Sequence, residues 1–120
     1  MPGQRQVLIV EDEKPLAHAL ELKLQHEGMT TVVASNGEDC LRLLKERQFD
    51  VVLLDMMMPV MDGFQVLQEI QKFPVKPTVF VLSNLSVHDD QTKVLALGAK
   101  KYFIKSDTSL AVIVDEVKKA

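Results

Sequence analysis

The segment VVLLDMMMPVMDG, at residues 51–63, decides the fold of this chain. Its first four residues are aliphatic, which is typical of a strand buried on both faces in a parallel sheet. Asp55 ends this apolar run, and a carboxylate in that position is costly to desolvate unless a cation or hydrogen-bond donors pair with it. Asp62 and Gly63 then predict a turn into a helix, with Asp62 as the N-cap. The rest of the chain should therefore supply the partners of Asp55.

Four further runs of β-branched or aliphatic residues predict strands on either side of this segment. They lie at residues 7–10, 30–34, 78–82 and 101–104. Apolar residues with helical spacing follow each predicted strand, most clearly at Leu110, Ile113, Val114 and Val117. Because strands that alternate with helices form right-handed crossovers, we expect a doubly wound α/β domain with a five-stranded parallel sheet covered on both faces.

Residues that commonly begin or end helices stand at the boundaries of these segments. Gly28 and Gly98 each follow a helical pattern, as expected of glycines just beyond a helix C-terminus. Asn36 is a good N-cap for the second helix, and either Ser106 or Asp107 for the last one. The alternation of strands and helices is therefore supported by the residues at the helix ends as well as by the apolar pattern.

Composition excludes several classes of protein. The 120 residues are 47% hydrophobic and 26% charged, which fits one ordinary soluble domain over residues 1–120. No apolar run approaches the roughly 20 residues that span a bilayer, and the N-terminus has no secretory pattern, so we expect a cytoplasmic protein with no membrane contact. A net charge of −3 lacks the electrostatic footprint of a nucleic-acid binder. The one cysteine, Cys40, forbids an internal disulfide and is expected to be a structural thiol in a helix.

Polar residues collect directly after four of the predicted strands. Alone, each reads as a solvated loop residue or a helix cap, but the carboxyl ends of parallel strands meet at one edge, where ligands bind in such folds. The residues concerned are Glu11, Asp12 and Glu13, then Asp55, then Ser83 and Asn84, then Lys105 and Ser106.

The chemistry of this group favours phosphoryl transfer. Converging carboxylates repel one another unless a cation lies among them, and oxygen ligands favour Mg²⁺ over Zn²⁺. The histidines have no metal-ligand spacing and are expected on the surface: His18, His26 and His88. An ammonium from Lys105 and a hydroxyl from Ser83 would complete a pocket for a tetrahedral anion beside Asp55, a competent nucleophile.

These residues occur in the order and at the spacing of a known family. The segments concerned are VEDE at 10–13, LLDMMMPVMDG at 53–63, VFVLS at 79–83 and YFIKS at 102–106. From about residue 5 to the end, the chain resembles the receiver domain of bacterial response regulators. The resemblance implies a flavodoxin-like (βα)₅ fold with strand order 2-1-3-4-5 and one receiver domain with a core at about 5–119.

The resemblance also implies roles in metal binding. Asp55 is the expected phosphoacceptor, and Glu11 and Asp12 are the expected metal-binding pair. The third protein ligand of Mg²⁺ in the family is a main-chain carbonyl two residues past the acceptor, which belongs here to Met57. Glu13 is expected instead in the first turn of the following helix, where the macrodipole favours its charge.

A switch is implied by the same resemblance. Ser83 corresponds to the hydroxyl residue that bonds the phosphoryl group, and Lys105 to the lysine that pairs with it. Tyr102 matches the aromatic switch position, although it also reads as a half-buried ring on an edge strand. When Ser83 moves toward the phosphoryl group, Tyr102 fills the vacated space and alters the surface of the fourth helix, fifth strand and fifth helix.

The chain departs from the family pattern near the site. Ser106 replaces the usual proline after the lysine, so we predict a trans peptide at 105–106 and a differently shaped loop. Asn84 replaces a small residue and narrows access to the acceptor. Met57 and Leu85 flank the approach of hydrolytic water, and we hypothesise that these apolar side chains exclude or fail to orient it, which would make self-dephosphorylation slow.

The implied function is signalling. A histidine kinase or phosphotransfer protein would supply the phosphoryl group, and the domain would catalyse only its own phosphorylation and dephosphorylation. The changed surface would serve a homodimer or a downstream effector, and the apolar Ala111 and Val112 of the last helix favour such partner contact.

Three other functions remain to be weighed. A pseudo-receiver would bind partners without being phosphorylated, and it is the main alternative. An aspartate-based phosphatase needs a second Asp where Met57 stands, and Met57 cannot transfer a proton. A nucleotide-binding domain needs a glycine-rich or hydroxyl-rich loop after the first strand, which EDEKPLA at 11–17 does not offer.

Overall fold

Five strands alternate with five helices along the part of the chain that the computed structural model describes, residues 5–58, 61–84 and 88–120. The strands are β1 (Gln6–Val10), β2 (Thr30–Ala34), β3 (Val51–Leu54), β4 (Thr78–Ser83) and β5 (Lys101–Ile104). The helices are α1 (Lys14–His26), α2 (Gly37–Glu46), α3 (Gly63–Ile70), α4 (His88–Ala96) and α5 (Leu110–Lys119), with a 3₁₀ turn, η1 (Lys105–Asp107), after β5. Each predicted strand is confirmed to within one residue at either end.

The strands form one parallel sheet in the order β2-β1-β3-β4-β5, which confirms the predicted topology. Val10, the last residue of β1, is in register with Ala34 of β2 and Leu54 of β3. On the other side of β3, Leu54 is in register with Val81, and Ser83 with Ile104. The carboxyl ends of the strands therefore meet along one edge, where the predicted site residues follow them.

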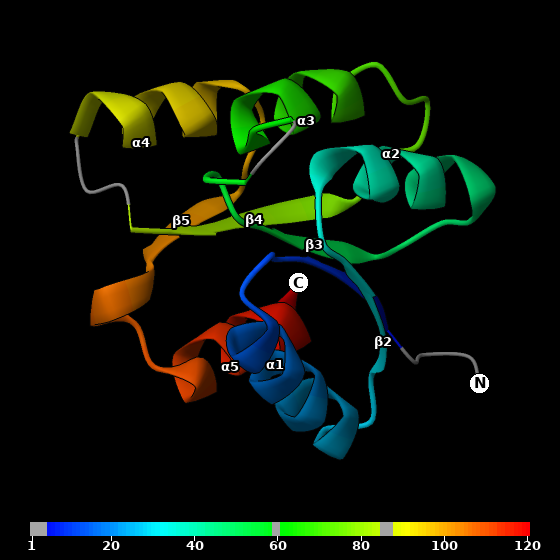
Figure 1. Cartoon of the computed structure of the whole chain (residues 1–120), viewed down its shortest axis with the longest axis vertical. Coiled ribbons are helices and arrows are strands. Elements are labelled where there is room, and N and C mark those ends of the chain that lie inside the picture. Colours follow the sequence, from blue (N-terminus) through cyan, green and yellow to red (C-terminus); the bar gives the residue numbers. More distant parts are fainter. Residues whose placement is uncertain (1–4, 59–60, 85–87) are drawn as a thin grey trace.

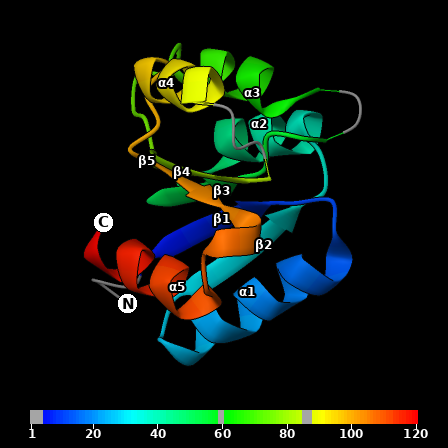
Figure 2. The same cartoon turned by 90° about the vertical axis from the view of Figure 1, so that its left-hand side faces the viewer.

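Helices cover both faces of this sheet (Figures 1 and 2). The helices α2, α3 and α4 lie on one face and α1 and α5 on the other. Because successive side chains of a strand point to opposite faces, Leu8 and Val10 join one core cluster while Val7 and Ile9 join the other. Within the described residues, no helix is both long and apolar enough to cross a membrane.

Most of the predicted helix boundaries are confirmed. Gly28 and Gly98 have the positive φ angles, 89° and 107°, that favour glycine just after a helix. Asn36 caps α2 and Asp62 caps α3, each by accepting a hydrogen bond from the backbone N–H three residues later. Local sequence therefore determined where these helices begin and end.

The predicted start of the last helix is wrong. Neither Ser106 nor Asp107 caps α5, because both lie in the 3₁₀ turn that follows β5. Ser109 caps this helix instead, and its hydroxyl accepts a hydrogen bond of 3.3 Å from the backbone N–H of Val112. The described residues contain no cis peptide bond, so the peptide between Lys105 and Ser106 is trans, as predicted.

The residues expected to have packing roles are placed accordingly. Cys40 is fully buried, and burial raises the pKa of its thiol to about 12. Met56 and Met58 are buried in the core, whereas the side chain of Met57 between them is 59% exposed. On α5, Val112 is 49% exposed, so the outer face of this helix is partly apolar, as its sequence predicted.

Candidate functional site

The end of β1 and the end of β3 place two acidic residues side by side. The backbone N–H of Asp55 donates to the carbonyl of Val10 at 3.0 Å, and that of Glu11 donates to Ala34 at 3.0 Å. The parallel ladder thus continues one residue beyond the strands, and it fixes the backbone from which both carboxylates project. Glu11 and Asp55 are each only 3% exposed, so two negative charges lie within the protein at adjacent strand ends.

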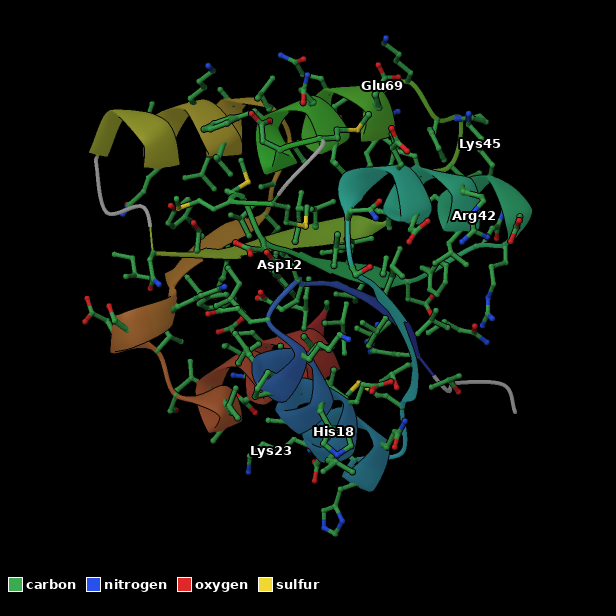
Figure 3. The ribbon with its side chains drawn as sticks, in the orientation of Figure 1. Asp12, His18, Lys23, Arg42, Lys45 and Glu69 are labelled. Atoms are coloured by element: carbon green, nitrogen blue, oxygen red, sulfur yellow. The ribbon has the colours of Figure 1, made fainter. Side chains whose placement is uncertain are left out.

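Asp12 brings a third carboxylate to the same place. It lies in the short loop between β1 and α1, at the level of the sheet and between the two helical layers (Figure 3). One carboxylate oxygen from each of Glu11, Asp12 and Asp55 lies within 4.8 Å of the others. The convergence predicted from strand order is therefore confirmed, and Asp12 forms its exposed side.

Lys105 provides the cation that these buried charges require. Its Nζ lies 2.9 Å from Oε1 and 3.1 Å from Oε2 of Glu11, and 3.3 Å from Oδ2 of Asp55. The side chain of Lys105 is 12% exposed, so its ammonium group is itself largely removed from water. One positive charge thus partly compensates two buried negative ones across the sheet edge.

Glu13 also pairs with Lys105, a contact that the sequence did not predict. Its Oε2 lies 2.9 Å from Nζ of Lys105, and its side chain is 60% exposed. It occupies the N-cap position of α1, one residue before the predicted first turn, but its side chain makes no capping hydrogen bond. Its proximity to Glu11 in the sequence was a signal, but a contact with a lysine 92 residues away depends on the closed fold.

Burial and charge shift the pKa values of the three most buried groups. Burial raises the pKa of Glu11 to about 7; the charge of Asp55 adds to this rise, and Lys105 opposes it. Burial also raises the pKa of Asp55, against the N–H of Met57 and the ammonium of Lys105. Burial alone would lower the pKa of Lys105, but hydrogen bonds to Glu11 and Glu13 raise it above its ordinary value. Burial therefore favours the protonated forms of Glu11 and Asp55, and a further cation at the site would favour their charged forms.

The donor set fits a hard divalent cation. Oε1 of Glu11 is buried and accepts no hydrogen bond from the described residues, although it lies 2.9 Å from the ammonium of Lys105. Three carboxylates can offer one oxygen each within a sphere of the right size, and no imidazole or thiolate takes part. Such a set favours Mg²⁺ over Zn²⁺. His18 and His26 are exposed on α1, as expected, whereas the side chain of His88 lies outside the described part of the chain.

Met57 holds the Asp55 carboxylate through its backbone. Its N–H donates a hydrogen bond of 3.1 Å to Oδ1 of Asp55, while Oδ2 faces Lys105. The two oxygens of Asp55 therefore have different partners, and the carboxylate cannot rotate without losing one of them. A role for the Met57 carbonyl as a metal ligand stays a prediction.

Ser83 and Tyr102 lie on β4 and β5, the two strands beyond β3 in the sheet. Ser83 ends β4 and is fully buried. Tyr102 is half-buried on β5, in register with Val81, and packs against the core cluster under α2, α3 and α4. Because Ser83 is two residues beyond Val81, its side chain is on the same face as Tyr102. The two predicted switch residues are thus neighbours on adjacent strands.

Two of the remaining predicted site residues are exposed. Asn84 is exposed after β4, and Ser106 is exposed in the 3₁₀ turn. Leu85, which was predicted to tune the rate of dephosphorylation, lies outside the described residues. Of the pair expected to flank hydrolytic water, only Met57 can therefore be placed, and its side chain projects toward solvent.

Comparison with known proteins identifies relatives along nearly the full chain. The family model for the response regulator receiver domain matches residues 7–117. The Francisella response regulator 1452 receiver domain is 28% identical, with a TM-score of 0.87, over 97% of this chain and 98% of that one. The receiver domain of a signal transduction histidine kinase from Syntrophus aciditrophicus is 29% identical, with a TM-score of 0.86, over 96% and 88%. The BeF3-activated receiver domain of DrrB is 27% identical, with a TM-score of 0.87, over 97% and 96%.

Proposed function

The chain belongs to the response regulator receiver family of two-component systems, and we propose that it accepts a phosphoryl group on Asp55 in a Mg²⁺-dependent reaction. The donor is the phosphohistidine of a histidine kinase or of a phosphotransfer protein. The phosphorus–nitrogen bond of the donor breaks as a bond forms between phosphorus and a carboxylate oxygen of Asp55. The product is an acyl phosphate inside the domain.

The main support for this proposal is the position of Asp55 beside one ammonium group and two further carboxylates. This carboxylate is 3% exposed, belongs to a three-carboxylate cluster that fits Mg²⁺, and has an ammonium 3.3 Å away. An incoming phosphoryl group would bring further negative charge, which only a site with fixed cations can stabilise. A purely structural aspartate does not require two other carboxylates beside it.

The proposed site residues have separate tasks in this reaction. Glu11, Asp12, Asp55 and the carbonyl of Met57 would hold Mg²⁺, which when bound neutralises charge on the phosphoryl oxygens. Lys105 binds another of those oxygens once the group has been transferred. The hydroxyl of Ser83 donates a hydrogen bond to a third. The Met57 N–H keeps one oxygen of Asp55 fixed, which leaves the other to act as nucleophile.

The signal passes from Asp55 to the surface through Ser83 and Tyr102. When the hydroxyl of Ser83 moves toward the phosphoryl group, it leaves space under α4 for the ring of Tyr102. The core thus has two packings, and phosphorylation shifts the population of molecules from one to the other. This shift reshapes the surface of α4, β5 and α5. A second copy of the chain or a downstream effector reads that surface.

The test is phosphorylation of the purified chain by a small acyl or amide phosphodonor. Intact mass spectrometry should show a gain of one phosphoryl group in the presence of Mg²⁺ and none with EDTA. Asp55→Asn should abolish the gain, whereas the matched Asp115→Asn, on the exposed side of α5, should keep it. An inert wild-type chain that still binds a histidine kinase would instead indicate a pseudo-receiver.

A further inference from the structure

We propose that Glu13 is a positioning residue that keeps hold of the Lys105 ammonium when Mg²⁺ takes Glu11 from it. The inference rests on the proposed function, because it concerns how a lysine and a metal ion share the same carboxylates. Its evidence is the geometry of one ammonium group among three acids.

The three acids that surround Lys105 differ in depth. Glu11 and Asp55 have side chains that are 2% and 3% exposed, whereas that of Glu13 is 60% exposed. The contact of Lys105 with Glu13 is nevertheless as short as its contact with Glu11, at 2.9 Å each. The ammonium therefore lies at a boundary, with two buried carboxylates on the inner side and Glu13 on the solvent side.

Only one of these acids is independent of the metal cluster. Glu11 and Asp55 belong with Asp12 to the set whose oxygens lie within 4.8 Å of one another, and Glu13 does not. A cation bound by that set competes with Lys105 for both buried partners. Glu13 is then the carboxylate that can go on pairing with the ammonium.

The position of Glu13 at the start of α1 suits this task. An acidic N-cap residue ordinarily accepts a hydrogen bond from the first turn of its helix, but the Glu13 side chain accepts none there. Its backbone N–H donates to Oε2 of Glu11 at 3.1 Å, so the same residue also orients the competing carboxylate. The side chain is therefore available to Lys105, and its backbone is anchored in the site.

The loss of Glu13 should affect the metal-free and the Mg²⁺-bound protein differently. Without metal, Lys105 pairs with Glu11, Asp55 and Glu13, so losing Glu13 removes one partner of three. With metal bound, Glu13 is the main remaining partner, so its loss leaves the ammonium poorly paired in a largely buried place. Removal of Glu13 therefore destabilises the Mg²⁺-bound state more than the metal-free state, and it weakens the affinity for Mg²⁺.

The experiment measures Mg²⁺ affinity of the full, unphosphorylated chain by isothermal titration calorimetry. Glu13→Gln should raise the Kd for Mg²⁺ by about threefold or more, the effect of one partly exposed ion pair. Glu46→Gln removes the same charge at the far end of α2 and should leave the Kd unchanged. Equal Kd values for Glu13→Gln and wild type would overturn the inference.

A double-mutant cycle separates action through Lys105 from a general loss of negative charge. In a Lys105→Met background, Glu13→Gln should change the Kd by a smaller factor than it does beside Lys105. The same factor in both backgrounds would contradict the proposed role. A second readout does not need Lys105→Met to fold: in the Mg²⁺-saturated protein, Glu13→Gln should shift the NMR resonances of the Lys105 ε-methylene group. Unchanged resonances would also contradict the role.

Titration of the wild-type chain with Mg²⁺ distinguishes a failure of the proposed metal dependence from a failure of the role proposed for Glu13. A wild-type chain that binds no Mg²⁺ overturns the proposed metal dependence, and this inference with it. A wild-type chain that binds Mg²⁺ with the same affinity as Glu13→Gln overturns this inference alone.

Discussion

Asp55 is a charged residue at a place where the neighbouring strand residues are fully buried, and its surroundings explain how it is tolerated. Its backbone continues the β1–β3 ladder, one oxygen accepts the Met57 N–H, and the other faces Lys105. These contacts hold the carboxylate in one orientation. At the scale of the residue, the two oxygens of the proposed acceptor, Asp55, already have different partners.

The side chain at position 57 should set how long the phosphoryl group lasts. Met57 follows the acceptor closely, its side chain is 59% exposed, and a thioether cannot orient water as an amide can. We expect Met57→Asn to speed loss of the phosphoryl group by about tenfold, the effect of one oriented hydrogen bond of about 1.4 kcal/mol. The rate is measured by intact mass spectrometry after the phosphodonor is removed.

Leu85→Glu, at the second predicted position, should speed the loss further when combined with Met57→Asn. Met61→Asn serves as the control, because Met61 packs against the core cluster rather than following the acceptor directly. An unchanged or slower loss in both Met57→Asn and the double variant would count against a role for these side chains.

At the scale of the element, β3 and α3 are joined by a turn that has no room for a side chain at Gly63. The Gly63 N–H donates to the carbonyl of Met56 at 3.1 Å. A Cβ atom on Gly63 would lie 2.6 Å from Cα of Met56 and 2.9 Å from the carbonyl oxygen of Asp55. The glycine therefore lets the start of α3 approach the backbone of Asp55 and Met56.

Gly63→Ala should lower both stability and phosphorylation. The added methyl group meets backbone atoms that cannot move aside easily, so we expect a loss of about 1–3 kcal/mol in the free energy of unfolding by urea. Displacement of the Asp55–Met57 turn should also slow phosphorylation by a small phosphodonor.

Gly28→Ala is the matched control for Gly63→Ala. Gly28 has a φ of +89°, but a Cβ there would meet nothing within 4 Å. The substitution should lower stability by about 1 kcal/mol through backbone strain alone and leave the phosphorylation rate unchanged. If both variants phosphorylate at the wild-type rate, the turn at Gly63 does not position the acceptor.

The elements show what local sequence could and could not predict. The five strands could be predicted because each is a short apolar run. The ends of two helices could be predicted because Gly28 and Gly98 readily adopt the positive φ angles found just after a helix. The start of α5 could not be predicted, because every residue from Ser106 to Ser109 is of a type that commonly caps helices. The 3₁₀ turn after β5 decided among them.

The same limit applies to the site. Asp55, Glu11, Asp12 and Lys105 could be brought together from strand order alone, because parallel strands end at one edge. The pairing of Glu13 with Lys105 could not be predicted in this way. Its carboxylate could cap α1 or pair with Lys105, and the choice depends on side-chain distances in the folded chain. Strand order predicts which residues are neighbours at the edge of a sheet. It does not predict which of their carboxylates pair with the same ammonium group.

At the scale of the whole molecule, we expect the site to couple metal binding to the stability of the fold. Lys105 extends from the end of β5 to carboxylates at the ends of β1 and β3, so its ion pairs join three strands. When no metal is present, this one ammonium offsets only part of the cost of burying Glu11 and Asp55. A ligand that binds only the folded site should therefore stabilise the entire domain.

Lys105→Met should make that dependence visible. In EDTA at neutral pH, loss of the ammonium leaves buried carboxylates unpaired and should lower the free energy of unfolding by about 3–5 kcal/mol. Millimolar Mg²⁺ should restore part of that loss, because the metal ion replaces the missing positive charge. Urea denaturation with and without Mg²⁺ measures both effects.

Lys118→Met is the control for a lysine with an exposed partner. Its Nζ pairs with Glu27 at 2.7 Å between α5 and α1, but the side chain is 50% exposed. This variant should change stability little, and Mg²⁺ should stabilise it as much as the wild type. Equal losses for Lys105→Met with and without Mg²⁺ would show that the metal ion does not take over the charge of the lysine.

The most direct test of Asp55 as the phosphoacceptor is to find which residue carries the phosphoryl group. The chain is treated with Mg²⁺ and a small acyl phosphodonor, and borohydride then reduces any aspartyl phosphate to homoserine, which tandem mass spectrometry locates. The account predicts homoserine at position 55 and at no other aspartate. Reduction at Asp12, or a phosphorylated chain with an unmodified Asp55, would contradict it.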